Sequence, residues 1–167
     1  MQTKIKLRPW SINDLDNLVK FGNNPAIAKN MTDQFPSPYT IEKGKNFISM
    51  AISAQPYHIL AIDNEGQAIG GIGLQLQQDI QRMNAEMGYW LAEPFWGKGI
   101  ITDAIKNMVS YGFSTWPINR IYARPFGHNI ASQKALEKAG FKLEATFKST
   151  LFKNDEYVDE LVYAIRR

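Results

Sequence analysis

Apolar residues recur along the chain with two different spacings. Apolar positions three or four residues apart predict helices at residues 11–21, at 40–52, over about four turns from Ile100, and at 129–140. Short apolar stretches bounded by polar or turn-forming residues predict strands at residues 4–8, 57–63, 68–76, 85–92, 119–126, 141–148 and 157–165. The pattern predicts a mixed α+β domain, with about four helices around one sheet of about six or seven strands.

Capping and turn residues mark the ends of several of these helices. Ser11, with Asp14 three residues later, has the pattern of a capping box, and Thr40 is placed to cap the second helix. The Asn-Asn-Pro segment at 23–25 is expected to end the first helix. Gly140 has the position of a C-terminal cap on the last helix.

Length and composition favour one globular unit. The chain has 167 residues and is 44% hydrophobic, which suits one core and leaves too few residues for two ordinary domains. We therefore expect a single domain over residues 1–167. The opening segment MQTKIKLRPW lacks the apolar core of a signal peptide, and no apolar run approaches the roughly 20 residues of a membrane span. These features predict a cytoplasmic protein with no membrane partner, and the sequence leaves open whether it is a monomer or a homodimer.

Charge and cysteine content narrow the kinds of site that the chain can hold. The formal net charge is +3, and the basic residues are interspersed with acidic ones, so we expect no nucleic-acid partner. There is no cysteine, which excludes disulfides, a thiol nucleophile and a cysteine zinc site. His58 and His128 are too isolated in the sequence to suggest a metal site.

A glycine-rich segment, EPFWGKGIITDAI at 93–105, lies between a predicted strand and a predicted helix. The first N–H groups of a helix lack partners within the helix, and the helix dipole favours negative charge there. Gly97 and Gly99 remove the side chains that would keep a phosphate away. The segment is therefore a candidate phosphate-binding loop, and a plain tight turn is the alternative.

Two common phosphate motifs do not fit this loop. The Walker motif needs a glycine five residues before the Gly-Lys pair and a hydroxyl residue after the lysine, but Ala92 and Gly99 stand there. The dinucleotide fingerprint needs a third glycine where Thr102 stands, together with a βαβ unit at the start of a parallel sheet.

The segments 85–105, 119–123 and 129–146 together resemble the GNAT acetyltransferases, in particular the ribosomal-protein N-acetyltransferases of the RimJ and RimL type. The resemblance implies the GNAT fold, with a central, mostly antiparallel twisted sheet, and acetyl-CoA as cosubstrate with no metal. The family loop begins with Gln or Arg, where this chain has Pro94. Many members carry a tyrosine that protonates the leaving thiolate, and Leu136 stands in its place.

The resemblance also implies a set of site residues. Glu86 would be the general base, and Ser132 would supply the proton for the thiolate. Backbone N–H groups of the strand before the loop would bind the pantetheine arm and the thioester carbonyl. Lys134 and Lys138, one turn apart on a face of the predicted helix 129–140, are candidates to meet the nucleotide phosphate, and a solvated helix face is the favoured alternative. The cofactor-binding residues would be Trp90, Leu91, Ala92, Trp96, Gly97, Lys98, Gly99, Ile100, Ile101, Thr102, Asn129, Ser132 and Lys134.

The acceptor would be a primary amine, either a protein N-terminal α-amine or a small-molecule amine, entering beside two loop segments. Those segments carry five acids, which could attract a cationic amine: Asp33, Asp155, Glu156, Asp159 and Glu160. Two alternatives stay open. The chain could be a non-catalytic CoA-binding sensor or partner-binding module, or a regulator that binds another nucleotide through the same loop.

Overall fold

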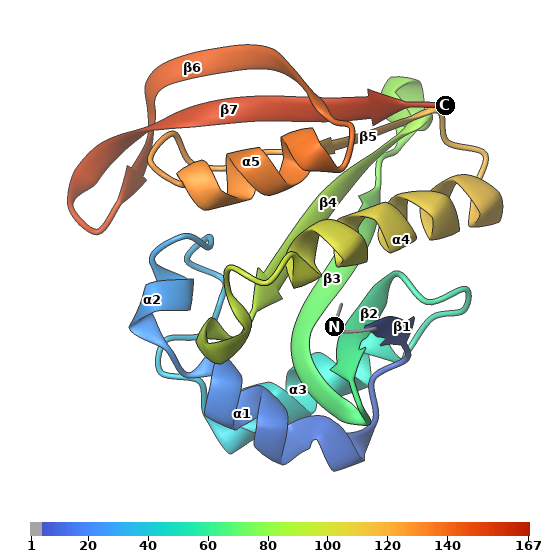
Figure 1. The fold of residues 1–167 in the computed structure, drawn as a ribbon, viewed down its shortest axis with the longest axis vertical. Coiled ribbons are helices and arrows are strands. Elements are labelled where there is room, and N and C mark those ends of the chain that lie inside the picture. Colours follow the sequence, from blue (N-terminus) through green and yellow to red (C-terminus); the bar gives the residue numbers. More distant parts are fainter. Residues whose placement is uncertain (1–4) are drawn as a thin grey trace.

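A seven-stranded sheet runs through the part of the chain that the computed structural model describes, residues 5–167 (Figure 1). The strands lie in the order β1-β2-β3-β4-β5-β7-β6. They are β1 Lys6–Arg8, β2 Ile59–Asn64, β3 Gln67–Leu76, β4 Asn84–Leu91, β5 Arg120–Ala123, β6 Lys142–Lys153 and β7 Glu156–Arg166. Neighbouring strands are antiparallel except β4 and β5. The expected mixed, mostly antiparallel sheet is confirmed, and Lys4, the first residue of the predicted strand 4–8, lies outside the described residues.

Residues 5–167 contain five α-helices where the sequence predicted about four. They are α1 Leu15–Gly22, α2 Pro25–Ala28, α3 Ile41–Ala51, α4 Ile100–Thr115 and α5 Ile130–Lys138, with 3-10 turns η1 Ile12–Asp14, η2 Asp79–Gln81 and η3 Glu93–Phe95. The additional helix is α2, in which the Asn24 side chain accepts a hydrogen bond from Ala26 N at 2.8 Å. Asn24 and Pro25 thus start a new helix directly after α1 ends, because proline suits the first turn. None of these helices is long and apolar enough to cross a bilayer.

The predicted caps are confirmed by their hydrogen bonds. The Asp14 carboxylate accepts from Ser11 N at 2.9 Å, and the Ser11 hydroxyl accepts from Asn13 N at 3.2 Å, at the start of η1. The Thr40 hydroxyl accepts from Lys43 N at 3.3 Å at the start of α3. These local contacts fix where two helices begin.

Two buried clusters cover opposite faces of the sheet, one under α4 and α5 and the other under α1 and α3. Figure 1 shows the positions of these helices. On one face, α4 and α5 contribute fully buried side chains such as Ile105 and Leu136. On the other face, α1 and α3 contribute Leu18 and Ile48, and the cluster extends across β2 and β3 to Trp90 of β4. Strand β4 therefore takes part in both cores.

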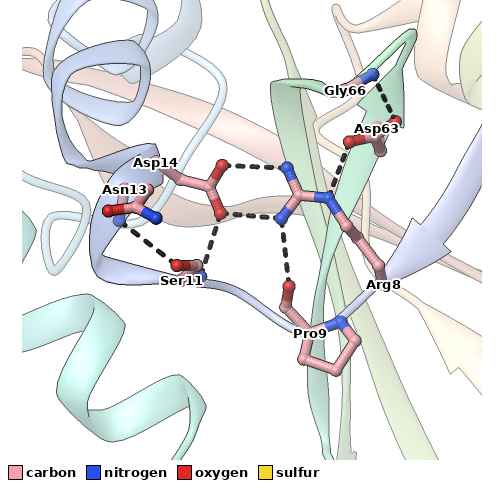
Figure 2. Close-up of polar contacts among 7 residues, drawn as sticks. All are labelled: Arg8, Pro9, Ser11, Asn13, Asp14, Asp63 and Gly66. Atoms are coloured by element: carbon pink, nitrogen blue, oxygen red, sulfur yellow. Dashed lines mark hydrogen bonds and ion pairs between the residues drawn. The ribbon is translucent and has the colours of Figure 1, made fainter.

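A polar cluster ties the N-terminal strand to the rest of the domain, as Figure 2 shows. The Arg8 guanidinium donates to Asp63 Oδ2 at 2.6 Å and, through two nitrogens, to the two oxygens of Asp14 at 2.7 and 2.8 Å. Asp63 also accepts from Gly66 N at 2.9 Å. Both carboxylates are buried. The cluster therefore holds β1, η1 and the turn between β2 and β3 in one arrangement.

Strand β6 continues past its predicted end at residue 148, to Lys153. Its register with β7 shifts between Phe147 and Leu151, and Ser149 in this bulge has a φ of 54°. Across the bulge, the Asp159 carboxylate accepts from Ser149 N at 2.8 Å. The polar residues after position 148, which the sequence pattern placed beyond the end of the strand, thus form a bulge within β6.

Candidate active site

Strands β4 and β5 separate after a short stretch of pairing. They are paired in parallel only from Asn84 to Glu86 of β4, opposite Arg120 to Tyr122 of β5. Strand β4 then continues to Leu91, paired with β3 alone. The β4 edge that faces β5 is therefore left unpaired beyond Glu86, close to the glycine loop.

The register of β3 and β4 decides which N–H groups of β4 face this open edge. Ala92 N donates to Ile69 O at 2.8 Å, and N–H directions alternate along an antiparallel pair. Trp90 N–H therefore also points toward β3. The expectation that Trp90, Leu91 and Ala92 would all present free donors is wrong for Ala92 and, by this alternation, for Trp90. The N–H groups that face the open edge belong to Leu91 and Tyr89.

The glycine loop leads directly into α4 and leaves the helix N-terminus accessible. Gly97 and Gly99 have φ values of 73° and 77°, and a Cβ atom on either would meet no atom of the described chain within 4 Å. Gly99 is the N-cap, and no described side chain caps the first turn. The side chain of Ile100 is buried in the core, so only its backbone is available at the loop. Ile101 and Thr102, half-buried, follow in the same turn.

The aromatic pair before the glycines holds the loop against β4. Trp96 Nε1 donates to Leu91 O at 2.7 Å, while part of the indole remains exposed. The Lys98 ammonium lies 5.4 Å from the centre of the Phe95 ring, on the surface. The loop is thus fixed by contacts to its own neighbours, and its two glycines stay open.

The start of α5 brings a serine to a tyrosine of β4. Asn129 Oδ1 accepts from Ser132 N at 3.3 Å and so caps the helix. Ser132 Oγ lies 2.5 Å from the Tyr89 hydroxyl, and burial raises the pKa of Tyr89 to about 12. Leu136 is fully buried, which agrees with its lacking any proton-transfer role. Lys134 lies exposed on the same helix.

Glu86 is held by an arginine that the sequence did not single out. Arg124 donates from Nε to Glu86 Oε1 at 2.7 Å and from Nη2 to Oε2 at 3.2 Å. Arg124 also lies 3.3 Å from Glu160 of β7, and the Tyr122 hydroxyl lies 3.5 Å from Glu86. The hydrogen bond to Glu86 is the main cause that raises the pKa of Arg124 above its ordinary value, against the opposing effect of burial. For Tyr122, burial first and the charge of Glu86 second raise the pKa.

The two candidate proton-transfer groups lie on opposite faces of β4. Tyr89 packs with the core under α4 and α5, whereas Trp90 packs with α1 and α3. Side chains alternate between faces along a strand, so Glu86 shares the face of Trp90. An acceptor amine and a leaving thiol at β4 would therefore meet their proton-transfer groups from opposite faces of the strand.

Most acids of the expected acceptor entrance are already paired with cations. The pairs are Asp33 with Lys153 at 2.7 Å, Asp159 with Lys148 at 2.9 Å, and Glu160 with Arg124 at 3.3 Å. Asp155 and Glu156, at the β6–β7 turn, form no ion pair within residues 5–167. The attraction expected for a cationic amine is correspondingly weaker. An open groove of about 720 Å³ lies beside the Asp33–Lys153 pair, lined in part by Phe35, Tyr39, Phe47 and Asn154.

The histidines lie apart from these groups. His58 stacks on Trp116 with ring centres 4.8 Å apart, and His128 lies 3.1 Å from Asn30. Among the described residues, no cluster of three His, Cys, Asp or Glu side chains could hold a metal ion.

Sequence reasoning missed two partners in this site, Tyr89 and Arg124. Tyr89 was not among the expected site residues, and its contact with Ser132 joins residues 43 positions apart. Arg124 follows a strand whose register against β4 is not visible in the sequence. A signal existed for Arg124, because a cation directly after the strand beside Glu86 is a natural partner for a carboxylate.

Comparisons with known proteins agree with this geometry. The acetyltransferase (GNAT) domain family matches residues 4–142. The uncharacterized N-acetyltransferase p20 of Bacillus licheniformis is 26% identical over 97% of this chain and 92% of its own. The ribosomal-protein-serine acetyltransferase of Escherichia coli (strain K12) is 31% identical over 62% of this chain, and that match spans 57% of the E. coli protein.

A solved structure shares the fold. RimL, a ribosomal L7/L12 α-N-protein acetyltransferase solved in complex with coenzyme A, aligns with a TM-score of 0.85 at 21% identity. The alignment covers 98% of this chain and 94% of RimL. The domain match over residues 4–142, together with the curated relatives, shows that the chain belongs to the GNAT family of acetyltransferases and is an N-acetyltransferase.

Proposed function

We propose that this chain transfers the acetyl group of acetyl-CoA to the α-amine of a protein or peptide N-terminus. The observation that carries the proposal is the continuity of two sets of unpaired backbone donors. The open edge of β4 ends at Leu91, and the uncapped N-terminus of α4 begins at Ile100, with the short turn η3 and the two glycines between them. A pyrophosphate with a long amide-containing arm, as in coenzyme A, matches donors arranged in this way.

The residues present fit the donor substrate at both ends of this path. The first N–H groups of α4 and the open positions at Gly97 and Gly99 would hold the pyrophosphate, and exposed Lys98 and Lys134 are available to the outer phosphates. The N–H groups of Leu91 and Tyr89 would bond the arm and the thioester carbonyl. A backbone donor aimed at a developing oxyanion contributes about 2.7–4 kcal/mol in known enzymes.

The partners of Glu86 support an α-amine as the acceptor. Both carboxylate oxygens of Glu86 already accept a hydrogen bond from Arg124, so an amine that is partly neutral near pH 7, and needs a base least, suits the site best. Ordinary pKa values are about 7.7–8.0 for an α-amine and about 10.4 for lysine. The names of the ribosomal-protein relatives point to the same class of acceptor. A cytoplasmic location fits this proposal.

The test is release of coenzyme A from acetyl-CoA in the presence of matched acceptors. A peptide with a free N-terminus and no lysine should be turned over. The same peptide blocked at its N-terminus, with one lysine added, should react at least about tenfold more slowly at pH 7.5, because its amine is mostly protonated. If a polyamine were the preferred acceptor, the proposal of an α-amine acceptor would be wrong. Absence of turnover with every amine would contradict the proposed function.

Substitutions in the glycine loop test the binding path separately. Gly97→Ala or Gly99→Ala should weaken coenzyme A binding about 5- to 30-fold in calorimetry, because the empty loop of the variant can relax from the left-handed conformation, and binding must then restore it at a cost of about 1–2 kcal/mol. The added methyl group would also stand where the phosphate approaches.

The matched control is Gly66→Ala. Gly66, in the β2–β3 turn, has a φ of 88° and no described atom within 4 Å of an added Cβ. It should lose similar stability while binding coenzyme A normally. Equal weakening in Gly66→Ala and Gly99→Ala would contradict a phosphate site at the loop.

A further inference from the structure

The contact between Tyr89 and Ser132 stands out among the hydrogen bonds near the open β4 edge. Their hydroxyl oxygens are 2.5 Å apart, a short distance for two neutral hydroxyls. One group comes from the middle of β4 and the other from the first turn of α5. Ser132 is also held through its backbone by Asn129. The hydroxyl contact thus joins β4 to α5, and the Asn129 cap holds the backbone of Ser132 in place.

The position of this pair relative to the open edge gives it a chemical use. Tyr89 is the residue whose own N–H, with that of Leu91, faces the unpaired side of β4. On this face of the sheet Leu136 is buried and has no proton to give. Tyr122, a phenol of β5, lies with Glu86 on the opposite face, and the Tyr163 hydroxyl on this face donates to Glu137 at 2.9 Å. Ser132 is therefore a candidate donor to a leaving thiolate on this side, and the Tyr89 hydroxyl is hydrogen-bonded to it.

We propose that Tyr89 is a positioning residue that aims the Ser132 hydroxyl at the leaving thiolate and replaces the proton that Ser132 gives up. The inference rests on the proposed function. As the carbon–sulfur bond breaks, the sulfur takes the Ser132 proton and Ser132 Oγ takes the Tyr89 proton in the same step. The resulting phenolate is then reprotonated by water. Proton loss from serine alone would leave an alkoxide, which is a stronger base than a phenolate. Burial disfavours the phenolate as well, so its reprotonation by water completes the step.

The test compares Tyr89→Phe with Ser132→Ala, using two acetyl donors. With acetyl-CoA, each variant should lower kcat about 10- to 100-fold, with little change in KM, as expected for lost proton transfer. The double variant should fall no further, because the two groups act as one unit. With a small aryl thioester, whose thiolate leaves without being protonated, Tyr89→Phe should keep the kcat/KM of the unmodified enzyme.

Controls separate this role from a structural one. Tyr111→Phe removes a hydroxyl that donates to Tyr57 O at 2.9 Å, and it should leave both reactions unchanged. Binding of coenzyme A to Tyr89→Phe, measured by calorimetry, should match that of the unmodified chain.

Three results would overturn the relay: unchanged kcat of Tyr89→Phe with acetyl-CoA, an equal loss with both donors, or a loss carried by KM alone. An unmodified enzyme that releases no coenzyme A with any amine would instead contradict the proposed function, and the relay with it. An active enzyme that is unaffected by Tyr89→Phe would contradict the relay alone.

Discussion

Replacing Arg8 with methionine is expected to lower the free energy of unfolding by about 3–5 kcal/mol, because it leaves buried carboxylates without their cation. Arg8 is the shared partner of Asp14 and Asp63, whose side chains are 8% and 1% exposed. Methionine keeps most of the apolar stem and removes the guanidinium. Urea unfolding followed by circular dichroism measures the change.

Lys148→Met is the matched control for this prediction. Its ion pair with Asp159 has a similar length, 2.9 Å, but the lysine is 79% exposed. Exposed pairs contribute about 0–1 kcal/mol, so this variant should unfold almost like the unmodified chain. Similar losses of unfolding free energy in Arg8→Met and Lys148→Met would show that burial does not determine how much the Arg8 cluster contributes to stability.

The same cluster predicts a loss of stability in acid. Burial alone would raise the pKa of Asp63, but the hydrogen bonds from Arg8 and Gly66 outweigh it and hold that pKa below its ordinary value. A carboxylate with a lowered native pKa stabilises the fold above its unfolded pKa of about 3.9, and the contribution is lost as the pH falls through the native value. Unfolding of Arg8→Met should therefore depend less on pH below about pH 4. An identical acid dependence in both proteins would contradict this account.

Glu86→Gln is expected to lower kcat for acetyl transfer about 100- to 10,000-fold if Glu86 is the general base. The substitution keeps the shape of the side chain and removes its ability to accept a proton. The loss should be larger with a lysine acceptor than with an α-amine, because the lysine amine is more fully protonated near pH 7. Initial rates of thiol release with both acceptors measure it.

Two further variants show whether Glu86 acts as a base or only anchors Arg124. Arg124→Gln breaks the same ion pair while keeping the carboxylate, so it should cost less than about tenfold. Glu144→Gln makes the same chemical change at a carboxylate held by Arg120 and Arg166, and it should leave transfer unchanged. Equal losses in Glu86→Gln and Arg124→Gln would show that the ion pair, and not the base, supports the reaction.

Features that depend on neighbouring residues could be predicted from the sequence. Ser11 with Asp14, and Thr40, bond to backbone groups within three residues, so their spacing alone identifies them. The positive φ values of Gly97 and Gly99 likewise depend on residue type and on position before a helix, and the loop before α4 was located correctly. The seven strands were also located, because each is a short apolar stretch bounded by turn residues.

Features that depend on strand register could not be predicted. The donors of Trp90 and Ala92 were expected at the open edge, and only the pairing of β4 with β3 shows that they point the other way. The Glu86–Arg124 pair depends on which residues of two strands lie side by side, and the pair of Tyr89 with Ser132 on where α5 packs against β4. Hydrophobic spacing specifies the face of a strand but leaves the register against its neighbours open.

We expect the open β4 edge and the α4 N-terminus together to hold acetyl-CoA for transfer to an α-amine. The most direct measurement is mass spectrometry of a peptide that carries both a free N-terminus and one lysine, after incubation with the protein and acetyl-CoA. The expected product carries one acetyl group on the N-terminal nitrogen, and Gly99→Ala should form much less of it at low acetyl-CoA. Acetylation of the lysine alone, or an unmodified peptide despite tight binding of coenzyme A, would contradict it.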